Sequence, residues 1–223
     1  FVRQAPNGVD PALFIFWRQG LATEGGPADI FGKISLSLEE PDVVAAPVLN
    51  LSTNTPAATP ADLLLDSEAD PIENAMAHRA IMRGSFIAIG YTYTWNGALQ
   101  RYTDLANLDF WIRRTIDGGA NWTAPMNLSN LKDTRISAKE PRLVYPVNSG
   151  VQDNNVFLAA WGTETNVYEG VEPVVPLDVM YTRTTDQGVS FEKVVPLAIG
   201  PSEDRESQLR IRDDGGATFA VVM

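Results

Sequence analysis

The sequence predicts an all-β fold built from repeated four-stranded units. Short runs rich in β-branched and aromatic residues recur along the chain, bounded by clusters of Gly, Pro, Asp and Asn. One turn sequence occurs twice, at Thr115–Trp122 and at Thr184–Phe191, with its aspartates 69 residues apart. Similar strand-like runs precede both copies. We therefore expect one supersecondary unit to repeat about every seventy residues.

The two turn sequences share the pattern Ser/Thr-x-Asp-x-Gly-x-x-aromatic. The Asp carboxylate can accept hydrogen bonds from N–H groups of its own turn. The Gly can take the positive φ of a tight hairpin, and the aromatic ring can pack between sheets. The residues that carry the pattern are Thr115, Asp117, Gly119 and Trp122, and Thr184, Asp186, Gly188 and Phe191. The sequence assigns them a structural role.

Residues 1–55 indicate a degenerate first unit. Its strands are expected at Leu13–Trp17, Asp29–Ser35 and Val48–Ser52. The turn pattern is missing there, and Leu38–Asp42 stands in its place. Residues 56–77 are rich in Thr, Ala, Pro and Asp, and are expected to form a linker or surface loop, with short helical turns at 62–65 and 73–77.

Two complete units follow, at 78–131 and at 140–200, and residues 205–223 begin a further one. The expected strands are Arg79–Met82, Phe86–Tyr91, Asp109–Arg114 and Pro125–Ser129 in the second unit, Arg142–Tyr145, Val156–Trp161, Asp178–Arg183 and Val195–Leu197 in the third, and Gln208–Ile211 and Thr218–Val222 in the last. The third strand of each unit opens on an aspartate, namely Asp29, Asp109 or Asp178.

Such units cannot bury both faces alone, and they stack around an axis as the blades of a β-propeller. The chain supplies about three blades, too few to close a ring. We therefore expect it to be a fragment or processed product, completed by the remainder of its own polypeptide or by another protein chain that covers its open flanks.

The repeated turn resembles the Asp-box, or BNR repeat, of sialidase-type β-propellers. The neighbouring sequences Arg113-Arg114-Thr115, Glu140-Pro141-Arg142 and Trp161-Gly162-Thr163-Glu164-Thr165 are similar to bacterial secreted propellers of the choice-of-anchor type (type O). The resemblance covers residues 75–223 well and the first 55 loosely. It implies a sialidase-like propeller of the six-bladed type and a bacterial protein that is extracellular, at the cell surface or periplasmic.

Composition excludes several classes of function. The net charge of −11 and pI near 4.5 argue against a nucleic-acid-binding surface, which is usually basic. The chain has no cysteine, so disulfides, zinc–thiolate sites and thiol nucleophiles are excluded. The single histidine, His78, excludes a multi-histidine metal site. No apolar run is long enough to span a membrane.

Three arginines form the sharpest candidate site. Arg79, Arg142 and Arg210 share one phase when the first strands of the units are aligned. First strands line the central channel of a propeller, so the three guanidinium groups are expected to meet there, with a geometry that suits a carboxylate. The resemblance implies the same arrangement, because sialidases hold a substrate carboxylate with three arginines. In the alternative, each arginine pairs with a local acid such as Glu73, Glu140 or Glu206.

No catalytic set can be assigned. Sialidase-type catalysis needs a Tyr nucleophile activated by a carboxylate, together with an acid. Candidates exist, but none lies in a matching motif: Tyr91, Tyr93, Tyr145, Glu140 and Glu164. Calcium is the one cofactor to consider, because Glu164 and Asp178, with Asp104 and Asp109, could supply oxygen ligands. Solvated loop acids are the alternative.

Three functions follow as hypotheses. The first is a non-enzymatic secreted or cell-surface propeller that acts as a binding or assembly module. The second is a sialidase-type hydrolase that uses the arginine cluster for an acidic sugar. The third is a subunit of a larger extracellular complex.

Overall fold

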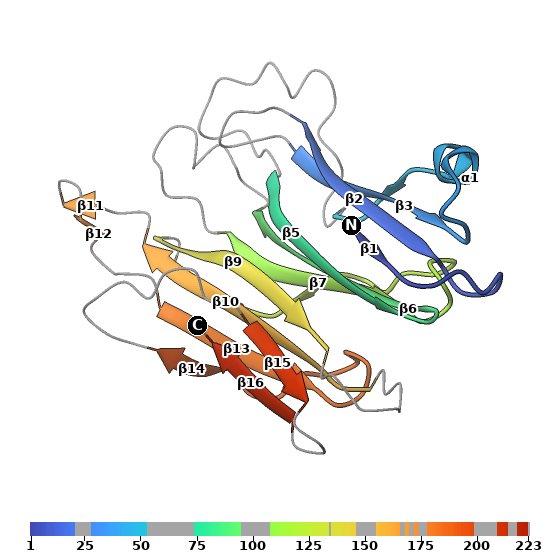
Figure 1. Ribbon diagram of the computed structural model, residues 1–223. Helices are drawn as coiled ribbons and strands as arrows, with labels where there is room; N and C mark the ends of the chain where they lie inside the picture. The colour runs from blue at the N-terminus through green and yellow to red at the C-terminus, as the bar shows by residue number, and fades with distance from the viewer. Residues whose placement is uncertain are drawn as a thin grey trace.

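The computed structural model describes residues 1–20, 28–52, 74–94, 108–133, 135–145, 155–165, 168–169, 172–173, 178–198, 209–213 and 218–222. Strands dominate these segments, and the all-β prediction is confirmed (Figure 1). The only helix in them is the short α1, Glu40–Ala45. In the part of the chain described, none of the helices has the length and apolar character needed to cross a membrane.

The first unit is an antiparallel meander in chain order. Its strands are β1 (Val2–Arg3), β2 (Leu13–Gly20), β3 (Ala28–Ser35) and β4 (Leu49–Asn50). The predicted strands at Leu13–Trp17 and Asp29–Ser35 are confirmed, whereas only Leu49 and Asn50 of the predicted Val48–Ser52 pair as strand. Helix α1 was not predicted. Its local signals are a proline in the first turn and two acidic residues there, which suit a helix N-terminus.

The second unit repeats the meander. Its strands are β5 (Asn74–Arg83), β6 (Phe86–Thr94), β7 (Asp109–Thr115) and β8 (Met126–Asn127). A parallel pairing of Ala28 with Asn74 joins the two units into one sheet. The helical turn predicted at 73–77 is wrong for residues 74–77, because pairing of Asn74 with Thr94 and of Ala75 with Tyr93 overrides local propensity. The turn predicted at 62–65 lies outside the described residues.

The third unit is a separate four-stranded sheet in the order β14-β13-β10-β9. Its strands are β9 (Ile136–Val144), β10 (Phe157–Thr165), β13 (Asp178–Thr184) and β14 (Val195–Ala198). Two short strands, β11 (Tyr168–Glu169) and β12 (Glu172–Pro173), pair between β10 and β13 in the chain. The hairpin of β15 (Leu209–Asp213) and β16 (Thr218–Val222) follows. As predicted, Asp109 and Asp178 are the first residues of the third strands, and Asp29 is the second residue of β3.

Strand β6 places the core on both of its faces. All nine of its residues are buried, and its side chains alternate between two clusters. Phe86 and Ala88 join the cluster shared with Phe157 and Trp161 of the third unit. Ile87, Ile89, Tyr91 and Tyr93 join the other cluster, with Phe14, Ile30 and Leu51 of the first unit. The three units are therefore stacked layers that share two apolar interfaces.

The first strands of successive units lie side by side. Strand β5 contacts β9, and β9 contacts β15. The described strands form an open stack and not a closed ring. This arrangement gathers the residues of β5, β9 and β15 at one edge of the stack.

Candidate functional site

Strands β5 and β9 carry the same β-bulge at the same place. On β5, Met76 pairs with Thr92 and Arg79 with Gly90, so three steps of β5 oppose two of β6. On β9, Lys139 pairs with Gly162 and Arg142 with Ala160, which gives the same count. The bulge residues Ala77 and Glu140 both have a φ of 46°. A positive φ is strained for a residue with a Cβ, and such strain and such bulges are frequent at functional sites.

Each bulge is followed by one of the candidate arginines. Arg79 Nη1 donates a hydrogen bond to the carbonyl of His78 (2.8 Å), and Arg142 Nη1 donates to the carbonyl of Pro141 (3.1 Å). Both guanidinium groups therefore fold back on the bulge in the same way. Among the described residues neither arginine forms a salt bridge.

The two arginines are close enough to influence each other. Partial burial and then the positive charge of Arg142 lower the pKa of Arg79, whereas the Glu140 carboxylate raises it. The Oε2 atom of Glu140 is buried and has no hydrogen-bond partner among the described residues. Glu140 is thus a neighbour of the arginines without forming the ion pair of the alternative interpretation. The other two acids considered, Glu73 and Glu206, lie outside the described residues.

His78 lies between these arginines and the first unit. Its ring lies edge-on to Phe16, with centroids 5.4 Å apart, and its buried Nδ1 has no partner in the described part of the chain. Burial lowers the pKa of His78, and the charges of Arg79, the terminal amine and Arg18 lower it further. Arg18 reaches across from β2 and donates to the carbonyl of Ala75 (3.0 Å).

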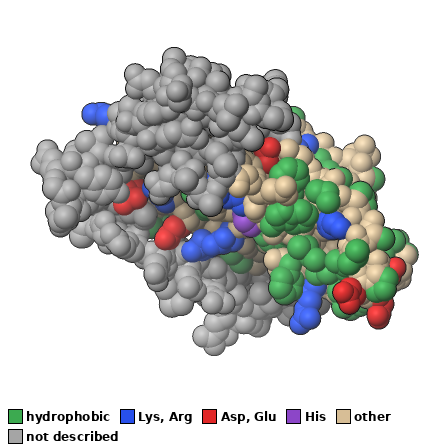
Figure 2. Space-filling model, turned by 90° about the horizontal axis from the view of Figure 1, so that it is seen from above, with side chains coloured by type: hydrophobic (Ala, Val, Ile, Leu, Met, Phe, Trp, Pro, Cys, Tyr) green, Lys and Arg blue, Asp and Glu red, His purple; other side chains and the backbone are tan. Residues whose placement is uncertain are grey.

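We refer to Arg18, His78, Arg79 and Arg142 as the basic cluster. Figure 2 shows the histidine, in purple, beside Lys and Arg side chains in blue. The three guanidinium groups of the cluster carry more positive charge than the neighbouring Glu140 carboxylate offsets. The geometry therefore suits an anionic ligand.

The third predicted arginine is placed only by its strand. Arg210 pairs with Val221 in the β15–β16 hairpin, and β15 contacts β9. Its side chain lies outside what the structure describes. Sequence phase thus found Arg79 and Arg142, but it missed Arg18 and both bulges, because these depend on pairing between distant strands.

The candidate tyrosines pack against core residues or against an arginine side chain. Tyr91 and Tyr93 lie in the core between the first two units, and Tyr93 packs edge-on against Trp111 at 5.9 Å. The guanidinium of Arg83 lies 4.3 Å from the ring centroid of Tyr145. The Tyr145 hydroxyl is buried without a partner among the described residues, and burial raises its pKa. A raised pKa disfavours the phenolate that a nucleophile needs.

The described acids considered for calcium, Asp109, Glu164 and Asp178, lie on three different strands. Glu164 lies 3.6 Å from Lys139 Nζ, and Asp109 accepts hydrogen bonds from Ser129 and Leu131. Asp178 lies opposite Thr163 at the start of β13, and Asp104 is outside the described residues. Within the described segments, no group of three or more His, Asp or Glu side chains gathers that could hold a metal ion.

The two aspartate turns, Thr115–Trp122 and Thr184–Phe191, occupy corresponding corners. Asp117 Oδ1 accepts from the backbone N–H of Asn121, and Asp186 Oδ1 from that of Ser190, both at 2.9 Å. These bonds, with those from the side chains of Thr115, Asn121, Thr184 and Ser190, lower each aspartate's pKa to about 2. Trp122 and Phe191 pack against successive core clusters. The turns therefore serve the packing between units.

No family model matches the chain. No curated protein matches it with significant similarity. The site must therefore be interpreted from its own geometry.

Proposed function

We propose that this chain is part of a sialidase-like, six-bladed β-propeller that acts as a secreted or cell-surface binding module for an anionic ligand. The observation that carries the proposal is the pair of identical bulges that bring Arg79 and Arg142 together beside His78. A carboxylate matches the donor geometry of guanidinium groups. An acidic sugar is the ligand class that fits best.

The layered packing supports the propeller. Four-stranded meanders stack face to face, and their first strands adjoin one another at one edge. Corresponding turns lie at corresponding corners, with Gly118 N–H bonded to Ser85 O and Gln187 N–H bonded to Asn155 O. Units related by a repeated rotation have these properties, and further units would continue the same stack.

A binding role is favoured over catalysis by the surroundings of the tyrosines. Tyr145 has a raised pKa, its hydroxyl has no hydrogen-bond partner among the described residues, and Tyr91 is fully buried. A tyrosine nucleophile needs both access to the substrate and a general base. The hydrolase remains the second candidate, and one observation favours it: Glu140, beside Arg79, has a buried carboxylate oxygen without a hydrogen-bond partner in the described segments.

A partner surface is part of the proposal. Leu13, Ile15 and Trp17 lie on one face of β2, and Trp17 stacks on Phe31 of β3 with ring centroids 6.2 Å apart. These half-buried side chains belong to none of the three core clusters. Further blades, from the same polypeptide or from another chain, would cover this face and make the protein a subunit of a larger assembly. The mass of the native particle tests this step.

Titration with 3′-sialyllactose tests the anion site. We expect binding to the native protein and at least a tenfold loss of affinity in Arg142→Ala, about 1.4 kcal/mol. Arg183→Ala is the matched control, since this arginine of β13 is exposed and already pairs with Glu192. Equal affinity of Arg142→Ala and the native protein would overturn the anion site. Release of sialic acid that depends on Glu140 would instead favour the hydrolase.

A further inference from the structure

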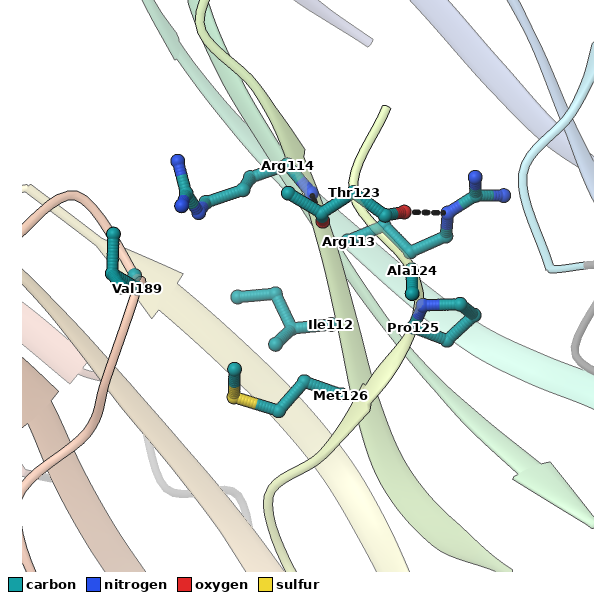
Figure 3. Close-up of a pocket in the computed structure, with 9 residues that line it drawn as sticks. Ile112, Arg113, Arg114, Thr123, Ala124, Pro125, Met126 and Val189 are labelled. Carbon is teal, nitrogen blue, oxygen red and sulfur yellow. Dashed lines mark hydrogen bonds between the residues drawn. The ribbon is translucent and has the colours of Figure 1, made fainter. Parts of the chain in front are cut away.

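A cavity lies between the second and third units, at the outer strands and away from the basic cluster. Its volume is about 340 Å³, and it is formed by β7, the segment Thr123–Met126 and the tip of the second aspartate turn (Figure 3). This volume is at the lower end of the range for small-molecule sites, roughly 300–1,000 Å³. The cavity therefore has room for one small molecule.

The walls of this cavity are mainly apolar. Ile112 is buried, whereas Met126 and Val189 keep 36% and 60% of their surface exposed. Ala124 and Pro125 complete the apolar lining. Figure 3 shows Ile112 and Met126 near the middle of the view, with Val189 across from them. An apolar body could bury these exposed side chains from water.

Among the described residues that line the cavity, only Arg114 has a guanidinium group without a hydrogen bond or salt bridge to a described residue. Arg113 turns to the opposite side and donates to Thr123 O at 2.9 Å. Arg114 extends towards the side of Val189, and its guanidinium makes no hydrogen bond or salt bridge with the described residues. Its Cδ lies close to Gly188, where an added Cβ would be only 3.2 Å away. None of the described residues that line the cavity is acidic.

Comparison of the repeated units shows that this cation is specific to one corner. The residue before Ser35, Thr115 or Thr184 is Ile34, Arg114 or Arg183. Ile34 packs against Gly119 of the next unit, so that corner is apolar. Arg183 is bonded to Glu192 at 2.8 Å. Of these three described positions, only that of Arg114 has both a guanidinium group without a salt bridge and an apolar cavity beside it.

We propose that this cavity binds a small carboxylate with a short branched or aromatic apolar body. The carboxylate would pair with the fork of the Arg114 guanidinium, and the body would lie against Ile112, Met126 and Val189. The site is independent of the anion site proposed at the basic cluster, because it uses different strands and the opposite edge of the second unit.

Titration of the full chain with 4-methylpentanoate, followed by amide NMR, tests the proposal. We expect saturable shifts at Met126 and Val189, and at least tenfold weaker binding of the neutral isostere 4-methylpentanamide. Arg114→Gln should lose at least tenfold in affinity for the carboxylate, and Arg183→Gln should lose nothing. Val189→Glu, which places a carboxylate at the exposed tip of the turn beside Arg114, should also abolish binding.

The same titration can overturn the site. Absence of saturable shifts at Met126 and Val189 would do so, as would equal affinities of the native protein and a folded Arg114→Gln. Acetate that binds as tightly as 4-methylpentanoate would remove the apolar part of the proposal. If Arg114→Gln fails to fold, continued binding to Val189→Glu decides against the site.

Discussion

Ser129 Oγ donates a 2.6 Å hydrogen bond to Asp109 Oδ1 and accepts the backbone N–H of Phe110 at 2.8 Å. The first unit repeats this pattern, with Ser52 Oγ bonded to Asp29 at 2.7 Å and to the N–H of Ile30 at 2.8 Å. In both units one serine closes the end of the fourth strand onto the start of the third.

Ser129→Ala should lower the free energy of unfolding by about 2 kcal/mol. The substitution removes a bond to a carboxylate and leaves the Phe110 N–H without its acceptor. Ser37→Ala is the control, because its hydroxyl accepts a single exposed N–H, and it should cost less than about 0.5 kcal/mol. Urea denaturation measures both. Equal losses for the two variants would show that the closing serine adds no stability.

Strands were predictable where apolar and aromatic residues cluster, as at Phe86–Tyr91 and Asp109–Arg114. The serine closure was not, although Asn-Leu-Ser occurs at the end of both fourth strands. Its Asn-x-Ser pattern equally fits a glycosylation acceptor, and nothing local indicates an aspartate some twenty residues away. Helix α1 was missed because a first-turn proline and two acids are common in loops as well.

The candidate site was predictable only in part, for the same physical reason. Aligning the first strands brought Arg79 and Arg142 into one phase, because a repeat conserves strand position. The positive φ of Ala77 and Glu140 leaves no local mark, since neither residue is one that favours that conformation. Arg18 joins the cluster through pairing with a strand more than fifty residues away.

Acid should weaken the aspartate turns between pH about 4 and about 2. The pKa of Asp117 and of Asp186 is about 2 in the folded protein, against an ordinary 3.8. Their stabilisation is thus complete above the ordinary pKa and is lost as pH falls through the folded value. In the double variant Asp117→Asn, Asp186→Asn, the midpoint of urea denaturation should depend less on pH in this window than in the native protein.

Asp133 titrates in the same window, because its bonds to Arg135 also lower its pKa to about 2. Asp133→Asn is therefore measured alongside. A double turn variant whose midpoints follow the native pH curve would assign the acid sensitivity to Asp133 or other acids.

Stability should also fall as pH drops below about 6.5, through His78. Burial and the neighbouring cations hold its pKa below the ordinary 6.5, so the unfolded chain takes up the proton first. The stabilisation linked to His78 is fully present above pH 6.5, and it is lost completely once the pH lies below the pKa of His78 in the folded protein. His78→Gln should remove this part of the pH dependence between pH 8 and 5. An NMR titration that places the His78 pKa above 6.5 would contradict the cause.

Gly119→Ala should be far more damaging than Gly8→Ala. Both glycines have a positive φ, of 95° and 76°, which costs a residue with a Cβ about 1–2 kcal/mol. At Gly119 an added Cβ would also clash with Ile34 Cδ1, whereas at Gly8 nothing lies within 4 Å. We expect losses of about 2 kcal/mol or more and about 1 kcal/mol, respectively, in urea denaturation, because the end of the Ile34 side chain has to move away from the new methyl group. Similar losses would mean that the turn shifts to accommodate the methyl group.

Ala77→Gly and Glu140→Gly separate strain from ligand binding at the two bulges. Glycine relieves the cost of φ 46°, about 1–2 kcal/mol, against a loss of about 0.5–1 kcal/mol in chain entropy. Both variants should therefore match or slightly exceed native stability, while Ala80→Gly, in regular β5 strand, should lose about 1 kcal/mol.

Glu140→Gly also removes the acid beside Arg79, so it should bind 3′-sialyllactose more tightly, and Ala77→Gly should bind it with unchanged affinity. Weaker binding by Glu140→Gly would show that its carboxylate orients the arginines, and the basic cluster would then require its own acid to hold an anion.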